Sequence, residues 1–508
     1  MKYAYNSKCR KSKRRAGATV LTIASLAFPI SATAEPVHAP SIVITASPLA
    51  RTTSELAQPV SIVEKEEISR SGAATLGNLL GAQPGVAQSS FTRGASRPII
   101  RGLDNSRVRI QENGLAAHDV SALSEDHGVP IDPSAAERVE VIRGPAALRY
   151  GSEAIGGLVS VLNNRIPDKA PDGGFEAEAE ANTTTADSGV MGRGSVDVSE
   201  GPIAVHIDAF ARSADDYSTP QGTQANSAAE ASGLSAGVSY LLPNGHVGVS
   251  VTQYNSDYRV PGAKAAANRI AIDLEQMRYA AAARLEDLSG FFTGLSADVG
   301  YSDYIHEEVS KVTGTIGSRF DNEEWEGRLE LLHRAIGDVE GAWGIQAASR
   351  DLSAAGEGGE LIAPSTSNRF AAFLFEEWKI NPALRLQVSG RIERVELEGL
   401  GTTSPTLEGV TLPGQELADF GSRRSLDFTP ISSAAALVFD LTDEIALGLN
   451  TQYVERAPDL LELFAKGPHE ATETFEIGSP TLGKESATSF DLSLTQNTGN
   501  LSLEANLF

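Results

Sequence analysis

The feature that most restricts the fold is a repeated alternation of apolar and polar residues from about residue 170 to the end of the chain. It is clear in residues 175–181, 203–209 and 247–251, and Pro243-Asn244-Gly245 forms a hairpin turn between two such runs. A period of two predicts β-strands with one apolar and one polar face. Such strands build a soluble sandwich or a membrane barrel, and the charged polar face favours a barrel with a water-filled interior.

The N-terminus predicts export. A basic stretch precedes the apolar run Ala16–Ile30, and Ala32-Thr33-Ala34 follows as a small-x-small cleavage site. This order is that of a secretory signal peptide spanning 1–34, and the run is too short for a membrane anchor. Cys9 leaves with the signal peptide, so disulfides and thiolate metal sites are excluded. No apolar stretch near 18 residues follows, which excludes a helical membrane protein.

The charge of the chain restricts its ligands. It has 42 Lys+Arg against 66 Asp+Glu, a net charge of −24. The signal peptide carries seven basic residues and no acid, so its removal leaves −31. Such an acidic chain repels phosphate backbones, which excludes nucleic acid as a partner and favours cations or ligands carried by cations.

Residues 50–165 have a different pattern, typical of a compact α/β domain. Residues 60–63, 107–111 and 138–142 predict strands, and residues 75–80 predict a short helix. Before this domain, a β-branched segment lies between prolines. It suits either an ordinary first strand or strand addition to a partner protein. Its residues are Ile42, Val43, Ile44, Thr45 and Ala46.

The α/β segment resembles the plug domain of TonB-dependent outer-membrane receptors. The resemblance rests on residues 75–86, on Ile100-Arg101-Gly102-Leu103, on the run 137–145 and on 150–157, in that order. It implies an N-terminal α/β plug domain (50–165) inside a transmembrane antiparallel β-barrel (166–508), in the bacterial outer membrane. It further implies that 35–49 holds the TonB box and a linker, with Ile42–Ala46 as the segment that pairs with the energy-coupling protein TonB. Outer-membrane lipid is the other implied partner.

The resemblance implies 22 strands, as in outer-membrane transporters with a plugged lumen. Residues 166–508 number 343. At roughly 24 residues per strand with its turn and loop, about 14 strands fit. The last apolar phase runs through Leu503, Ala505 and Leu507 rather than the terminal Phe508. We therefore expect a barrel that is incomplete at its C-terminus.

Three histidines lie beside acids. His127 follows Glu125 and Asp126, His306 precedes Glu307 and Glu308, and His469 precedes Glu470. Imidazole and carboxylate together can bind a divalent cation, although a solvated polar loop has the same composition. Strand alternation places His306 and Glu308 on the inward face and Glu307 on the outward one. His38, His206, His246 and His333 lie in contexts without acid clusters, and His118 is ambiguous.

These regions resemble the zinc-uptake branch of the same receptors. The shared motifs are Ser-x-Asp-His at 124–127 with Asp132-Pro133, Asp-Tyr-x-His-x-Glu at 303–308, Gly-Pro-His-x-Ala-Thr at 467–472, and Gly356-Glu357 with Ala363-Pro364-Ser365. The resemblance implies uptake of a metal or metal chelate, zinc first, and no permanently bound cofactor. The implied metal site is Asp126, His127, His306, Glu308 and His469, with Glu308 favoured over Glu307.

Two other ligands and one other class of function are also compatible with the sequence. Arg456-Ala457-Pro458, His469 and Ser479-Pro480-Thr481-Leu482 resemble the arrangement of haem receptors, and a siderophore is the third ligand to consider. A non-transporting surface receptor or adhesin anchored by a barrel is the alternative from another class. No His-Glu-x-x-His motif or other catalytic set is found, so we expect no enzyme.

Overall fold

The computed structural model describes residues 48–49, 60–143, 148–401, 422–442, 444–469, 474–498 and 501–508. The predicted signal peptide and the Ile42–Ala46 segment lie outside these residues. Within them, two sets of elements are distinguished by their pairing. One is a small mixed sheet near the N-terminus, and the other is a large antiparallel sheet.

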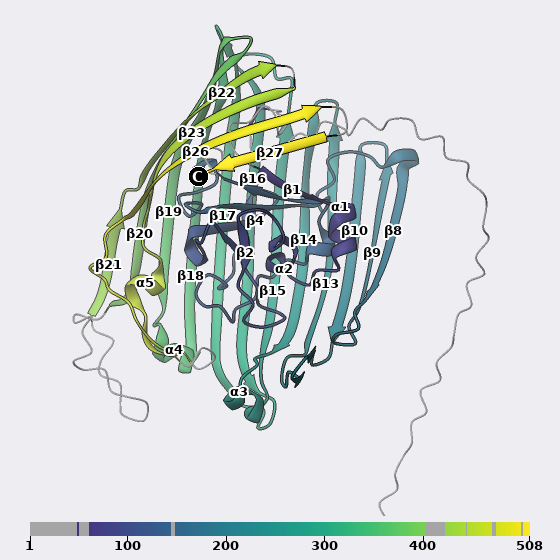
Figure 1. Cartoon of the computed structure of the whole chain (residues 1–508), viewed down its shortest axis with the longest axis vertical. Helices are drawn as coiled ribbons and strands as arrows, with labels where there is room; N and C mark the ends of the chain where they lie inside the picture. Colours follow the sequence, from purple (N-terminus) through teal and green to yellow (C-terminus); the bar gives the residue numbers. More distant parts are fainter. Residues whose placement is uncertain are drawn as a thin grey trace, which may run out of the picture. The chain divides into compact units, whose positions relative to one another are not determined.

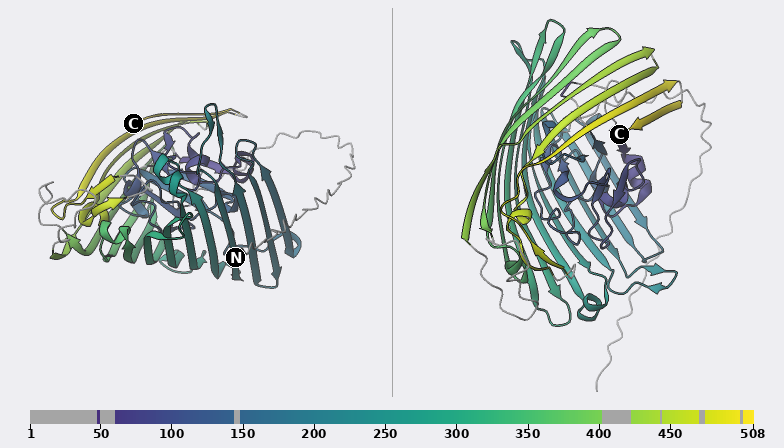
Figure 2. Two further views of the ribbon diagram at one scale, coloured as in Figure 1. Left: turned by 90° about the horizontal axis from the view of Figure 1, so that it is seen from below. Right: turned by 60° about the vertical axis from the view of Figure 1, so that its left-hand side comes forward.

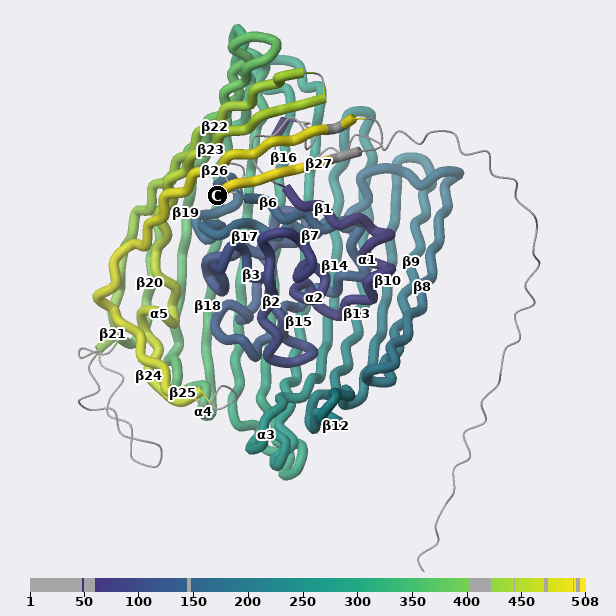
Figure 3. Tube along the Cα trace, in the orientation of Figure 1, coloured from purple at the N-terminus to yellow at the C-terminus, as the bar shows by residue number. Residues whose placement is uncertain are grey.

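The plug domain is built on a five-stranded sheet in the order β1-β6-β7-β4-β5. Figure 3 labels β1, β6 and β7 of this sheet. β4 and β7 pair in parallel, and the other neighbours are antiparallel. These strands are β1 (Val60–Glu64), β4 (Val108–Glu112), β5 (Leu115–Ala116), β6 (Arg138–Ile142) and β7 (Gly157–Leu162). The other plug elements are β2 (Val86–Gln88), β3 (Pro98–Ile100), α1 (Lys65–Ser71) and α2 (Leu76–Leu80).

The predicted plug strands are confirmed within one residue, and so is the helix near residue 75. Thr75 caps α2 by accepting from the Asn78 backbone N–H, and the buried leucines of α2 join the plug core. The sequence analysis did not predict strands β2, β3, β5 and β7, and it also missed helix α1. Its signals were Glu66 and Glu67 in the first turn and Gly72, which takes the left-handed conformation that ends the helix.

The large sheet forms a wall of sixteen strands, fifteen of them in one linear order from β8 to β27 (Figure 1). Its first eight strands are β8 (Phe175–Thr183), β9 (Val190–Glu200), β10 (Ile203–Ala214), β13 (Ala229–Leu242), β14 (Gly245–Arg259), β15 (Ile270–Leu285), β16 (Phe292–Ser310) and β17 (Ile316–Ile336). The others are β18 (Val339–Gly356), β19 (Ser365–Asn381), β20 (Leu384–Gly401), β21 (Ser422–Phe428), β22 (Ile431–Thr442), β23 (Ile445–Arg456), β26 (Glu485–Thr498) and β27 (Leu501–Leu507).

The expected fold class, a plug with an antiparallel wall of strands, is confirmed. The expected count of about 14 strands was low. Strands β8 to β10 have only 9 to 12 residues. Strands β21 and β22 both pair with β20, β21 along one part of it and β22 along another. On average, each strand therefore uses less chain than the count assumed. No helix of the described residues is long and apolar enough to cross a membrane.

Along each wall strand, side chains alternate between a face against the plug and an exposed apolar face. Figure 2 shows the plug elements on the concave side of the sheet. On the other face, large apolar residues such as Val247, Val249 and Val251 are exposed. Tyr279, Tyr301 and Trp325 form one register row across β15, β16 and β17 on that face. Aromatic residues bordering an apolar band are typical of a barrel in a membrane.

The connections orient the wall. At one end, two-residue turns join β9 to β10, β13 to β14, and β17 to β18. At the other end, longer connections carry the remaining elements. These are β11 (Ser218–Thr219), β12 (Gly222–Thr223), α3 (Ala263–Asn268), α4 (Glu357–Leu361), α5 (Leu460–Phe464), β24 (Lys466–His469) and β25 (Thr474–Ile477). Short turns face the periplasm in such barrels and longer loops face the outside, so α3, α4 and α5 mark the outer end.

Candidate functional site

The wall contributes two donors from the outer half of β16. His306 and Glu308 lie two residues apart, face inward and are buried. His306 is opposite Leu274 on β15 and Phe320 on β17, both of which are also buried. Glu307, between the two donors, instead forms an ion pair with Arg319, 2.7 Å from Oε1 to Nη1. The alternation of the strand therefore places Glu308, and not Glu307, toward the plug.

The plug contributes Asp126 and His127 from the loop between β5 and residue 133. Both side chains are buried. The His127 Nδ1–H donates to the Val120 carbonyl over 3.1 Å, which directs Nε2 away from its own loop. The Tyr258 hydroxyl donates to the Asp126 carbonyl (2.7 Å) and accepts from the Gly128 N–H (2.8 Å). The hydroxyl of Tyr258, a residue of β14, thus fixes the backbone on both sides of His127.

The third segment is the β24–β25 hairpin at the outer end. His469 ends β24, and Glu476 lies on β25 opposite Gly467. The His469 Nδ1–H donates to Glu476 Oε1 over 2.9 Å. Its Nε2 lies 3.4 Å from Asp126 Oδ1. The hairpin therefore directs one imidazole nitrogen at the plug loop.

These three segments bring all five predicted metal-site residues together, and we call Asp126, His127, His306, Glu308 and His469 the donor cluster. One ligand atom from each of Asp126, His127, His306 and Glu308 lies within 4.8 Å of the others. The ring of His127 has its centroid 4.2 Å from that of His306 and 5.6 Å from that of His469. The three segments lie more than 150 residues apart in the sequence, so only the fold assembles them.

Several atoms of the donor cluster lack the hydrogen bonds that buried polar groups normally make. Among the described residues, Asp126 Oδ2, His127 Nε2 and His306 Nε2 are buried without a hydrogen-bond partner. The surroundings are largely apolar: Val120, Leu123 and Tyr304 belong to the hydrophobic core around the cluster. Desolvating carboxylates in such a place is costly unless a cation compensates.

Burial and the neighbouring donors shift the pKa values of the residues in the donor cluster. Burial alone would raise the pKa of Asp126, but His127, His469 and Ser124 hold that pKa below its ordinary value. Burial also lowers the pKa of His469, but hydrogen bonds to Asp126 and Glu476 outweigh it and raise this pKa to about 10. Burial lowers the pKa of His127 despite the nearby carboxylate. At neutral pH, His469 therefore carries a proton that pairs with Asp126, while neutral His127 offers a lone pair.

The donor set suits a borderline divalent cation. Imidazole nitrogens and carboxylate oxygens are the usual ligands of zinc in proteins without thiolates. Histidine ligands commonly donate their second N–H to a carbonyl or carboxylate, which orients the ring and raises its basicity. Val120 and Glu476 occupy those positions for His127 and His469. The geometry can hold one metal ion between the plug, the wall and an outer loop.

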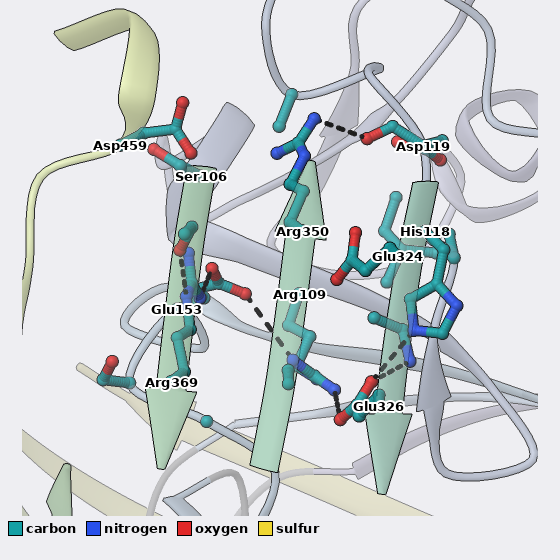
Figure 4. A pocket seen from close by; sticks show the side chains of 18 of the residues that line it. Ser106, Arg109, His118, Asp119, Glu153, Glu324, Glu326, Arg350, Arg369 and Asp459 are labelled. Atoms are coloured by element: carbon teal, nitrogen blue, oxygen red, sulfur yellow. Dashed lines mark hydrogen bonds and ion pairs between the residues drawn. The ribbon is translucent and has the colours of Figure 1, made fainter. Parts of the chain in front are cut away.

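A second polar region lies between the plug and β17 to β19, around a cavity of about 120 Å³ (Figure 4). Several of its charged groups form ion pairs or hydrogen bonds within the region. Glu326 accepts from Arg109 Nη2 over 2.6 Å and lies 3.3 Å from His118 Nε2. Arg369 pairs with Glu153, and Arg350 donates to the Asp119 carbonyl over 3.1 Å. Because these acids already bind arginines, this region is a weaker candidate for a metal than the donor cluster.

Sequence reasoning missed the residues that support the donor cluster. Tyr258, Glu476 and Val120 fix its backbone and ring orientations, but none lies beside a predicted donor in the sequence. It also read His206 as isolated from acids. In the structure the His206 Nδ1 lies 2.9 Å from Asp197 Oδ1, and its Nε2 lies 3.3 Å from Asp208 Oδ2. Asp208 is two residues away on the same strand, so alternation alone could have indicated it.

Models of two domain families match the chain. The TonB-dependent receptor plug domain matches residues 52–158, and the TonB-dependent receptor-like β-barrel matches residues 201–508. Among curated proteins, the vitamin B12 transporter BtuB of Vibrio vulnificus (strain CMCP6) is 29% identical over 184 residues. That match covers 34% of this chain and only 30% of the relative.

Solved structures show the same fold at low sequence identity. The copper transporter OprC is 16% identical with a TM-score of 0.73, over 88% of this chain and 70% of the other. The hemophore receptor HasR of Serratia marcescens, solved with its hemophore HasA and heme, is 14% identical with a TM-score of 0.71. That alignment covers 87% of this chain and 70% of the receptor.

Proposed function

The chain belongs to the TonB-dependent receptor family, whose β-barrels lie in the bacterial outer membrane, and from this we propose that it takes up a divalent transition-metal cation, with zinc as the first candidate. The cation is the transported substrate and binds at the donor cluster. The observation that carries the proposal is the convergence of five buried nitrogen and oxygen donors from plug, wall and outer loop.

The donor chemistry supports zinc over the other ligands. Copper(I) prefers thiolate or thioether sulfur, whereas the donor cluster contains none. Haem iron takes one or two axial ligands from a protein and four nitrogens from its own ring. A group of donors within 4.8 Å of one another is instead suited to a bare ion or one carried on a small chelator. Nickel and cobalt share the same ligand preferences, so competition between metals is part of the test.

The division of the donors suggests how the ion is released. Asp126 and His127 belong to the plug, His306 and Glu308 to the wall, and His469 to an outer loop. Any movement of the plug away from β16 separates the donors and lowers the affinity of the site. We assign the energy for this movement to TonB, which would pair with Ile42–Ala46 by strand addition. Binding outside and release inside then need only one site.

The central test compares zinc binding by the protein purified from outer membranes with that of an Asp126→Ala/His127→Ala variant. We expect tight zinc binding by the parent protein and a large loss in the variant. His246→Ala is the matched control, since His246 lies on β14 outside the donor cluster. Equal zinc affinity in the parent and the double variant would refute the site. Heme is titrated in parallel, and binding of heme without zinc would refute the choice of ligand.

Transport is separated from binding by deleting Ile42–Ala46. We expect the deletion to abolish uptake of radioactive zinc by cells and to leave zinc binding unchanged. A surface receptor or adhesin, the alternative from another class, predicts that the deletion changes neither quantity. Uptake that persists after the deletion would therefore contradict the transporter.

A further inference from the structure

An apolar groove crosses the outward face of the wall from β17 to β22, with a volume of about 760 Å³. Two register rows line it, and each takes one outward residue from five neighbouring strands. One row is Leu331, Trp343, Leu374, Gly390 and Ser433, and the other is Leu329, Ile345, Ala372, Ile392 and Ile431. The groove lies on the face that the apolar side chains expose to lipid.

Small residues create the groove. Gly390, Ser433 and Ala372 lie among larger side chains. Three of these larger residues, Ile345, Leu374 and Ile431, are between 40% and 52% exposed. A Cβ added at Gly390 would meet no atom closer than 4.0 Å, so open space lies above that position. The volume falls in the range of roughly 300–1,000 Å³ that is usual for small-molecule sites.

A carboxylate lies at the periplasmic end of this groove. The Trp343 Nε1–H donates to Glu376 Oε1 over 2.8 Å, and His333 Nε2 lies 3.0 Å from Glu376 Oε2. Phe291 stacks on His333 with centroids 5.7 Å apart. Glu376 faces outward, one row beyond Leu374, and its side chain is 25% exposed. Because Trp343 belongs to the groove and to this cluster, the two features are continuous.

This carboxylate can accept a further cationic donor from outside the chain. Within the described residues, the basic side chain that contacts Glu376 is His333, which forms an ion pair only when its imidazole is protonated, and no lysine or arginine pairs with Glu376. A carboxylate has about four lone-pair positions, and the bonds from Trp343 and His333 use two. An acid facing lipid at a membrane interface is costly unless it is neutralised, and aromatic rings around it add cation–π attraction. An anionic headgroup would be repelled here.

We propose that the groove and the Glu376 carboxylate together bind one phospholipid with a primary ammonium headgroup, of the phosphatidylethanolamine type. The acyl chain lies along Leu374 and Ala372, and the ammonium group bonds to Glu376. The periplasmic position of Glu376 assigns the lipid to the inner leaflet, which consists of phospholipid. The site is independent of the proposed metal transport, because it lies on the opposite face of the wall from the donor cluster.

The test is native mass spectrometry of the detergent-purified protein, delipidated and then mixed with equal amounts of phosphatidylethanolamine and phosphatidylglycerol. We expect the parent protein to retain the amine lipid about tenfold more, because only its ammonium group can donate a charge-assisted hydrogen bond to Glu376; a tenfold preference corresponds to about 1.4 kcal/mol. Glu376→Gln should lose this preference, and Gly390→Leu should lose retention of both lipids by filling the groove. Glu323→Gln is the matched control, since Glu323 lies on β17 nearer the outer end and accepts from the Tyr301 hydroxyl.

Equal retention of the two lipids by the parent protein would overturn the proposal, and this comparison needs no variant to fold. An unchanged preference in Glu376→Gln would overturn the assigned headgroup contact. A loss of preference in Glu323→Gln as large as that in Glu376→Gln would also overturn it, because any outward carboxylate would then suffice.

Discussion

Replacing Glu308 by Gln tests the donor cluster with a built-in control one residue away. Glu308 faces the plug beside His306, whereas Glu307 pairs outward with Arg319. Gln keeps the shape of the side chain but is a poor zinc ligand. We therefore expect Glu308→Gln to weaken zinc binding strongly and Glu307→Gln to leave it unchanged.

The magnitude follows from the number of ligands. Structural zinc sites bind with apparent free energies of about 10–16 kcal/mol at pH 7. If about four ligands share this, one contributes about 2.5–4 kcal/mol, which corresponds to a Kd about 10²–10³-fold higher without it. Loss of the surface pair of Glu307 with Arg319 costs less than about 1 kcal/mol of stability and no affinity.

The assay is competition with a chromophoric zinc chelator at fixed pH, on protein whose fold is checked by circular dichroism. A zinc Kd for Glu308→Gln that equals the Kd of the parent protein would refute the assignment of the inward carboxylate. Equal weakening of zinc binding in Glu308→Gln and Glu307→Gln would also refute this assignment, since the loss would then depend on the net charge of the strand rather than on the orientation of one side chain.

Three further predictions concern the cluster and its supports. Because the His469 pKa is raised to about 10, zinc must displace the proton of His469 at neutral pH, so zinc binding should release about one proton and tighten about tenfold per pH unit up to that pKa. A binding enthalpy that does not depend on the ionisation enthalpy of the buffer would contradict this proton release. Tyr258→Phe removes the hydroxyl between Asp126 and Gly128 and should lower the free energy of unfolding by about 1–3 kcal/mol and weaken zinc binding; an unchanged zinc Kd would show that this hydroxyl does not position the loop. Glu330→Ala leaves the buried Arg149 and Arg328 without their shared partner and should cost about 3–5 kcal/mol in urea unfolding; a cost below about 1 kcal/mol would contradict the pairing.

The sequence was informative wherever a short-range rule decides the structure. Alternation within β16 correctly placed His306 and Glu308 inward and Glu307 outward, because side chains of a strand alternate without exception unless a bulge intervenes. The bulge of β16 against β17 follows Glu308 and leaves this phase intact. Plug strands β1, β4 and β6 were predicted within one residue, whereas β2, β3, β5 and β7 were not predicted.

The assembly of the donor cluster was not predictable from local patterns. His127, His306 and His469 are joined by strand pairing and loop packing over hundreds of residues, and only the family resemblance had grouped them. The supporting bonds of Tyr258 and Glu476 depend on the same long-range packing. The strand count was low because the chain used per strand varies with turn and loop length, which composition does not reveal.

The most direct test of the account is X-ray absorption spectroscopy at the zinc edge on the purified protein loaded with one equivalent of zinc. The donor cluster predicts about four nitrogen and oxygen ligands near 2.0–2.2 Å, with the multiple-scattering signature of at least two imidazoles. That signature should be lost in the Asp126→Ala/His127→Ala variant. A zinc ion coordinated only by oxygen, or an unchanged spectrum in the variant, would contradict the donor cluster as the zinc site.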